Sequence, residues 1–200
     1  SDLVEVSIAA WPWGAYLGED SKEIGIRAKV ASWRRMSADS FIPESKATGQ
    51  YLNSVLAKIE ATKAGYEEAI LLDQRGFVGE GSGENIFIVK DEVIITPSLV
   101  GGILEGITRN SVLTIARDLG IGIVERDVAR TELYAADEVF VTGTAAEVAA
   151  IREIDDHPVG AGRRGPVTAQ LQQVFEDAIR GRDTRYASWL DRVEVPAPTA

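Results

Sequence analysis

Short apolar runs, each about as long as one β-strand, recur along nearly the whole chain, and turn-forming residues separate them. They occupy residues 3–10, 24–33, 68–72, 77–78, 86–90, 93–96, 121–125, 138–142 and 148–155. Apolar residues at helical spacing predict helices over 51–63, 109–119 and 166–180, and a short helix over 131–137 that begins at a threonine cap. This alternation predicts a protein of mixed α and β class, and 200 residues that are 45% hydrophobic suffice for one large core. We expect the first two runs to pair with each other.

The net charge and the missing residue types exclude several classes of function. The formal net charge is −10 and no basic cluster interrupts it, which argues against nucleic acid and anionic membrane surfaces as partners. The chain has no cysteine and a single histidine, His157, in a turn-forming segment, so disulfides, thiolate catalysis and metal sites are disfavoured. No apolar run is long enough to span a bilayer. We therefore expect a cytoplasmic protein without a metal site.

Lys46 stands among small, uncharged residues where an extended segment changes into the first predicted helix. Pro43 keeps the residue before it extended, and apolar residues recur at helical spacing from Tyr51 onward. A lysine at such a junction can point its amine into a pocket, where loss of water contacts favours the neutral, nucleophilic form. A solvated surface lysine is the ordinary alternative, so the case for Lys46 depends on the motifs that follow it.

Two glycine-bordered segments suggest a phosphate site. Residues 106–108 open a helix, whose free amides and dipole favour an anion. Residues 143–145 follow a strand and can present amides beside the hydroxyl of Thr144. Ordinary helix capping or a β-turn explains either segment alone, but with a reactive lysine the two predict a phosphorylated aldehyde cofactor. No GxGxxG motif follows a predicted strand, and GxxxxGK[ST] is absent.

The glycine-rich loop at residues 79–85 adds a third element. Glycines let the backbone pass close to a planar ligand. A carboxylate that faces a pyridine nitrogen keeps it protonated, which allows pyridoxal phosphate to act as an electron sink. Glu80 and Glu84 are both available for this role, and their spacing does not choose between them.

Four motifs occur in a fixed order: SKATGQYLNS at 45–54, EGSGEN at 80–85, GITR at 106–109 and TGTAAE at 142–147. They resemble the successive motifs of bacterial branched-chain amino-acid aminotransferases, which are class IV, fold-type IV pyridoxal-phosphate enzymes. The resemblance covers essentially all 200 residues, including PWGAYLG at 12–18 and the C-terminal helix. It implies an α+β protein, the large C-terminal domain of that fold, with mixed β-sheets in a barrel-like arrangement surrounded by helices.

The resemblance also implies how pyridoxal 5'-phosphate is held. Lys46 would form the Schiff base and shuttle the proton, Tyr51 would hydrogen-bond the ring hydroxyl oxygen, and Glu80 rather than Glu84 would pair with the pyridine nitrogen. The remaining contacts would come from Leu104 on the ring face and from Ile107, Thr108, Gly143 and Thr144 around the phosphate.

The same resemblance implies a substrate and an assembly. The amides of Thr144 and Ala145 would face the substrate carboxylate, while Trp13 and Tyr16 would form the side-chain pocket. The reaction would move the amino group of L-leucine, L-isoleucine or L-valine to 2-oxoglutarate, in a homodimer or larger homo-oligomer. D-Amino-acid aminotransferases, aminodeoxychorismate lyases and (R)-amine transaminases share the lysine and phosphate motifs, and a non-catalytic fragment is the alternative outside enzymology.

The chain departs from the family pattern at its start. Residues 1–18 would be the start of the large domain with the interdomain and substrate loop, and residues 19–200 the large cofactor-binding domain. Nothing here matches the family's smaller N-terminal domain, which supplies an arginine to the phosphate. We therefore expect weak cofactor retention and little activity from these 200 residues alone.

Overall fold

The computed structural model describes residues 3–12, 14 and 17–193, which fold around one mixed β-sheet. Its strands are β1 (Ile26–Arg34), β2 (Glu68–Leu72), β3 (Val78–Gly81), β4 (Asn85–Lys90), β5 (Val93–Thr96), β6 (Ile123–Glu125), β7 (Glu138–Gly143), β8 (Glu147–Ile154) and β9 (His157–Pro158). Their order is β3-β2-β1-β8-β7-β4-β5-β6, and β9 pairs with β8. The pairs β1–β2, β1–β8 and β5–β6 are parallel, and the others are antiparallel.

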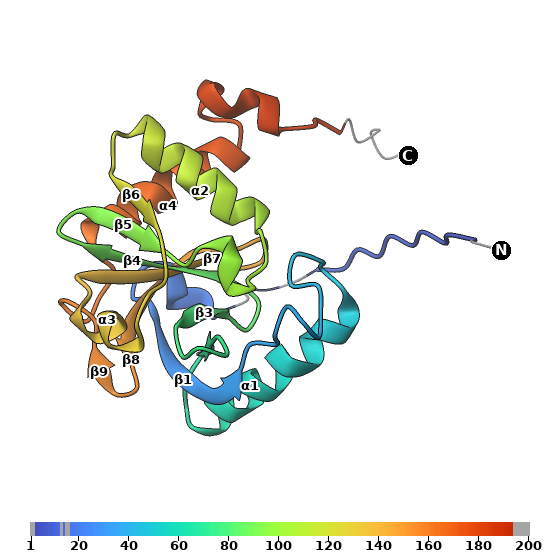
Figure 1. Ribbon diagram of the computed structural model, residues 1–200. Coiled ribbons are helices and arrows are strands. Elements are labelled where there is room, and N and C mark those ends of the chain that lie inside the picture. Colours follow the sequence, from blue (N-terminus) through green and yellow to red (C-terminus); the bar gives the residue numbers. More distant parts are fainter. Residues whose placement is uncertain (1–2, 13, 15–16, 194–200) are drawn as a thin grey trace.

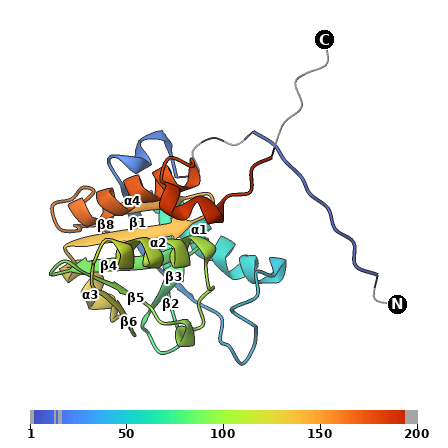
Figure 2. The same ribbon diagram turned by 90° about the horizontal axis from the view of Figure 1, so that it is seen from above.

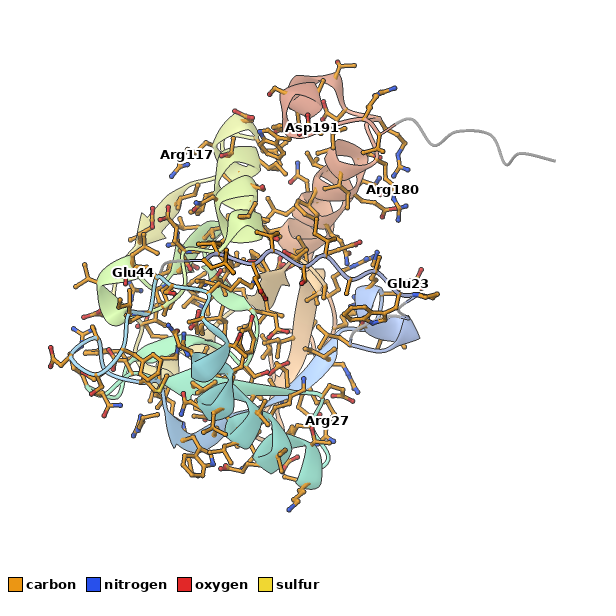
Figure 3. All side chains as sticks on the ribbon, turned by 90° about the vertical axis from the view of Figure 1, so that its right-hand side faces the viewer. Glu23, Arg27, Glu44, Arg117, Arg180 and Asp191 are labelled. Atoms are coloured by element: carbon orange, nitrogen blue, oxygen red, sulfur yellow. The ribbon has the colours of Figure 1, made fainter. Side chains whose placement is uncertain are left out.

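Helices pack on the sheet in two places. The α-helices are α1 (Tyr51–Lys63), α2 (Ile107–Asp118), α3 (Arg130–Ala135) and α4 (Pro166–Ile179), and the 3-10 helices are η1 (Glu19–Lys22), η2 (Thr48–Gln50), η3 (Leu99–Gly101) and η4 (Thr184–Trp189). Helices α2 and α4 lie side by side over one part of the sheet, and α1 covers β1 and β2 (Figure 1). Figure 3 shows the α2–α4 pair with Arg117 near the end of α2 and Arg180 near the end of α4. Among the described residues, no helix has both the length and the apolar content needed to cross a membrane.

Both faces of the central strands are buried, which explains their continuous apolar runs. On β4, Ile86 and Ile88 belong to one core cluster, while Phe87 and Val89 belong to the cluster under α2 and α4. Phe87 stacks on Phe140 of β7, with ring centroids 4.8 Å apart. The sheet is therefore a rigid support, and the segments that leave its strands are held in defined positions.

The prediction of a strand over residues 3–10 is wrong. Residues 3–10 form no regular structure and extend away from the sheet (Figures 1 and 2), and Ile8 is 94% exposed. A strand is stabilised by pairing and by burial of one face, and residues 3–10 have neither among the described residues. β1 instead lies between β2 and β8, with Ala28 opposite Glu68 and Ile26 opposite Ile151. The expected pairing of the first two runs is therefore also wrong.

Two helix starts differ from the prediction. α2 begins at Ile107, two residues earlier than expected, because the extended Gly106 is its N-cap. α3 begins at Arg130, so Thr131 lies inside the helix and the expected threonine cap is wrong. The Glu132 carboxylate performs the capping by accepting a hydrogen bond of 2.8 Å from the Ala129 amide.

Candidate functional site

A cavity of about 260 Å³ lies where the segments after β1, β3 and β7 meet the start of α2. One water occupies about 30 Å³ in the liquid, so the cavity has room for a small organic molecule. Its lining includes all eight residues that the sequence nominates for the cofactor: Lys46, Tyr51, Glu80, Leu104, Ile107, Thr108, Gly143 and Thr144. The four motifs, distant in sequence, therefore converge on one place.

The residues nominated for the substrate are less fully placed. Thr144 lines the cavity, but Ala145 is exposed in the turn between β7 and β8 and is not part of the lining. Trp13 and Tyr16 lie outside the described residues. The substrate side of the site thus stays a prediction.

Glu80 on β3 is a buried carboxylate with three partners. Its Oε1 lies 2.5 Å from Nε of Arg35. Its Oε2 accepts hydrogen bonds from the Leu104 amide (3.1 Å) and from Nδ2 of Asn85 (3.3 Å). Burial raises the pKa of Glu80 to about 7, against the opposing effect of the Arg35 and Lys46 charges. At neutral pH this carboxyl is therefore able to exchange a proton with a base in the cavity.

Arg35 is a lining residue that sequence reasoning missed. It follows β1 directly, and its amide donates to Leu72 O at 2.8 Å while its own carbonyl accepts from Nε2 of Gln74 at 2.6 Å. The neighbouring Arg34 is exposed, whereas Arg35 is buried. The pair of arginines at the strand end was a visible signal, but alternation along the strand does not say which of them turns inward once the strand has ended.

Asn85, in the EGSGEN motif, joins three parts of the site. Its Nδ2 donates to Leu104 O at 2.8 Å as well as to Glu80, so it ties the start of β4 to the segment before α2. Its Oδ1 lies against Gly106, where a Cβ would stand only 2.1 Å from that oxygen. Gly106 is therefore required for the close approach of α2 to the sheet.

The cavity end at α2 is suited to an anion. Gly106 has no side chain to cap α2, so the first amides of this 12-residue helix keep their hydrogen-bonding capacity. Gly143 and Thr144 line the same cavity, and Gly143 packs close to the Gly83 carbonyl. The hydroxyl of Thr142, which is buried in the lining, has no hydrogen-bond partner among the described residues. A ligand that accepts or donates hydrogen bonds here would satisfy these groups.

Lys46 lies in the segment between β1 and η2, at the edge of the cavity. The residue as a whole is exposed, and the expected removal of its amine from water stays a prediction. The segment runs outside the sheet, as the position of Glu44 shows (Figure 3), and it is only partly covered, since Pro43 is buried next to Gly102 while most of its neighbours are exposed. Lys46 nevertheless lines the same cavity as Thr108 and Thr144, and its charge acts on Glu80.

The fold and the site define an α+β protein with a ligand cavity at one end of its sheet. The family model of amino-transferase class IV matches residues 2–154. The chain therefore belongs to the class IV aminotransferases.

The known relatives show which class IV aminotransferases this chain resembles. The chain is 50% identical over 191 residues to the branched-chain-amino-acid aminotransferase of Pseudomonas aeruginosa, covering 96% of this chain and 62% of that protein. It is 53% identical to the probable branched-chain-amino-acid aminotransferase of Aquifex aeolicus, covering 94% and 60%. The chain thus spans about 60% of the length of these relatives.

Solved structures agree on the fold. The branched-chain aminotransferase of Thermoproteus uzoniensis with norvaline has a TM-score of 0.86 at 48% identity, covering 92% of this chain and 59% of that one. The branched-chain amino acid aminotransferase of Thermobaculum terrenum, in its PLP form, has a TM-score of 0.84 at 42% identity, covering 90% and 58%. The predicted fold is therefore confirmed as the α+β, fold-type IV arrangement, a mixed sheet forming a half-barrel with helices.

Proposed function

We propose that the cavity binds pyridoxal 5'-phosphate and that the whole protein is a branched-chain-amino-acid transaminase. The observation that carries the proposal is the convergence of Lys46, the buried Glu80 and the N-terminus of α2 on one cavity. Support comes from the relatives, which are described as branched-chain-amino-acid aminotransferases, and from the solved structure of one in its PLP form.

The residues present fit this cofactor. The α2 amides at Ile107 and Thr108 and the Gly143–Thr144 turn suit a phosphate, and the unpartnered hydroxyl of Thr142 offers a further donor. Glu80 suits the pyridine nitrogen, because Arg35 and the Leu104 amide fix its carboxylate while burial favours sharing a proton. Leu104 and Tyr51 also line the cavity, where Leu104 would lie against the ring face and Tyr51 would hydrogen-bond the ring hydroxyl oxygen.

Bound pyridoxal phosphate supplies an electron sink for the carbon that loses its proton. The chain's own residues do the rest. Lys46 provides the amine that holds the cofactor and that takes the substrate's α-proton and returns it to the neighbouring cofactor carbon. Glu80 holds a proton at the ring nitrogen. The amides around Thr144 orient the carboxylate of the amino acid.

The substrates in this proposal are L-leucine, L-isoleucine or L-valine and 2-oxoglutarate. A hydrophobic pocket discriminates a single methylene by only about 1–3 kcal/mol, so activity on all three amino acids is expected. A cytoplasmic location and assembly as a homodimer or larger homo-oligomer belong to the same proposal. Three apolar residues on the outer face of α1, Leu52, Val55 and Ile59, are exposed and available for such an assembly.

The test is an amino-transfer assay on the full-length protein with 2-oxoglutarate as acceptor. We expect glutamate from L-leucine, L-isoleucine and L-valine, and none above background from D-alanine. Glutamate from D-alanine alone would assign the site to D-amino acids. Pyruvate release from aminodeoxychorismate without amino transfer would assign it to a lyase.

A further inference from the structure

Two buried carboxyl groups stand behind the glycine loop of the cavity and have no part in the chemistry described above. Glu84 precedes β4 and lines the cavity, and only 3% of its surface is exposed. Glu68 on β2 is fully buried. Burial of two acidic side chains is costly unless each is paired or neutral, so their partners identify their charge state.

Both carboxyls hold the turn at residues 81–83. Glu84 Oε2 accepts a hydrogen bond of 3.1 Å from the Gly83 amide, and Glu68 Oε1 accepts one of 3.2 Å from the Ser82 amide. The Gly81 amide donates to Glu84 O at 2.7 Å. The turn directly follows Glu80, so these bonds fix the backbone on which Glu80 stands.

A lysine is paired with one of the two groups. Lys58 on α1 places its Nζ 2.5 Å from Glu68 Oε2, and Ala69 N donates to Glu68 Oε1 at 2.7 Å. Glu68 is thus equipped to be the ionised member. The carboxyls of Glu68 and Glu84 lie within hydrogen-bond reach of each other, and two carboxylates in contact do not both ionise readily.

Glu84, in contrast, has a carboxyl oxygen without a hydrogen-bond partner in the part of the chain that the structure describes. Its Oε1 is buried and finds no hydrogen-bond partner among the described residues. A carboxylate oxygen only accepts, but a protonated one donates. With a proton on Glu84, its carboxyl becomes a donor from which Glu68 can accept a hydrogen bond.

We propose that Glu84 and Glu68 share a proton that resides on Glu84, and that this pair is a positioning device for the turn at 81–83 and hence for Glu80. Burial first, and then Glu68, raise the pKa of Glu84 to about 8, while Lys58 and the Gly83 amide oppose the shift. The proton is therefore present at neutral pH and leaves in mildly alkaline solution. The link from Glu80 to a cofactor ring rests on the proposed function, whereas the shared proton does not.

The proton is observed directly by infrared difference spectroscopy of the cofactor-free full-length protein, titrated from about pH 6 to about pH 9. We expect a carboxylic-acid C=O band that is lost near pH 8 and is missing in Glu84→Gln. Glu80→Gln serves as the matched control, because it should remove only the carboxylic-acid C=O absorption of Glu80, which is lost near pH 7. A band near pH 8 that persists in Glu84→Gln, or no such band in the wild type, overturns the proposal.

The positioning role is tested by binding of pyridoxal phosphate across the same pH range. The glutamine of Glu84→Gln mimics the neutral acid, since its amide donates to Glu68 and its oxygen accepts from Gly83. Above about pH 8 we expect wild-type affinity to fall by up to about tenfold per pH unit relative to Glu84→Gln, the limit for one linked proton. Equal pH profiles overturn the positioning role. Absence of binding at every pH, with the infrared result intact, refutes the proposed function and leaves the shared proton standing.

Discussion

The cavity has two sides that differ in almost every physical respect. Its inner wall, formed by Arg35, Glu80, Asn85 and Thr142, is buried and comes from the sheet or the residues next to it. Its mouth, formed by Lys46, Tyr51, Ile107 and Thr144, is exposed, and Ile107 is 82% exposed. In the inner wall, the Arg35–Glu80 ion pair and the hydrogen bonds of Glu80 and Asn85 hold the side chains in place. We infer that Glu80 in the inner wall fixes the position of the ring nitrogen, and that the mouth, which carries Ile107 and Thr144 of the proposed phosphate site, is where further contacts complete the site.

The largest expected effect is at the mouth. Replacing Lys46 with alanine in the full-length protein removes the amine to which the proposed function assigns the proton transfer, so turnover of L-leucine should fall by at least about 10³-fold. The fold should survive, since Lys46 is exposed. Single-turnover assays and thermal unfolding measure the two effects. A variant that keeps a tenth of wild-type turnover would remove Lys46 from the mechanism.

A substitution in the inner wall should instead lower the free energy of unfolding. Arg35→Met leaves Glu80 buried without its cation, and breaking a buried pair in this way typically costs about 3–5 kcal/mol. Arg182→Met is the matched control, because Arg182 and its partners Glu176 and Asp177 are all partly exposed and such pairs contribute about 1 kcal/mol or less. Urea unfolding in mildly alkaline solution, where the Glu80 carboxyl is ionised in the wild type, compares them. Equal costs would mean that the inner wall is not preorganised by this pair.

The contact between α2 and the sheet is tested by replacing glycines with alanine. Gly106→Ala introduces a Cβ that cannot coexist with the present position of Asn85 Oδ1, so a loss of about 1–3 kcal/mol and weaker phosphate binding are expected. Gly101→Ala, whose Cβ would meet open space, should be nearly silent. Urea unfolding measures the stability of both variants, and titration with inorganic phosphate measures their affinity for the anion. Full phosphate affinity in Gly106→Ala would contradict the anion site.

The protonation of Glu80 in the inner wall makes the stability of the folded protein depend on pH. The pKa of Glu80 is raised from 4.5 to about 7 in the folded protein, so between these values the folded state holds a proton that the unfolded state has lost. Stability should therefore fall as pH rises through that window, and Glu80→Gln should flatten the curve. Glu44→Gln, on the exposed segment before Lys46, should leave the curve unchanged. A stability that rises over this window in a Glu80-dependent way would reverse the assignment.

The smallest effect concerns the unpartnered hydroxyl. Thr142→Val removes a buried group without a partner among the described residues and keeps its shape, so the cofactor-free protein should gain up to about 1 kcal/mol. Calorimetry of cofactor-free protein detects the change. A loss of stability would show that the hydroxyl already has a partner.

The sequence predicted the fold well where burial is two-sided. The strands at 68–72 and 93–96 match β2 and β5 residue for residue, because continuous apolar runs suffice to indicate fully buried strands. The run at 3–10 alternates apolar and polar residues, which predicts a half-buried strand, yet nothing in the described chain pairs with it. Local pattern reports the capacity to form a strand, and the partner decides the outcome.

The site was predicted to a similar degree. Motifs brought out Lys46, Thr108 and Thr144, because a lysine junction and glycine-bordered turns are local features. Arg35 and Asn85 were missed as functional residues, since their importance comes from contacts with Glu80 and Gly106 that a strand or turn pattern does not show. Spacing alone also left Glu80 and Glu84 equivalent, and only their partners, Arg35 for one and Glu68 for the other, distinguish them.

The most direct test of the convergence is a crystal structure of the full-length protein grown with pyridoxal phosphate. We predict electron density that is continuous from Nζ of Lys46 to the coenzyme, with the ring nitrogen on Glu80 and the phosphate at the start of α2. A coenzyme bound elsewhere, with the Lys46 amine in water and the α2 amides unengaged, would contradict the account.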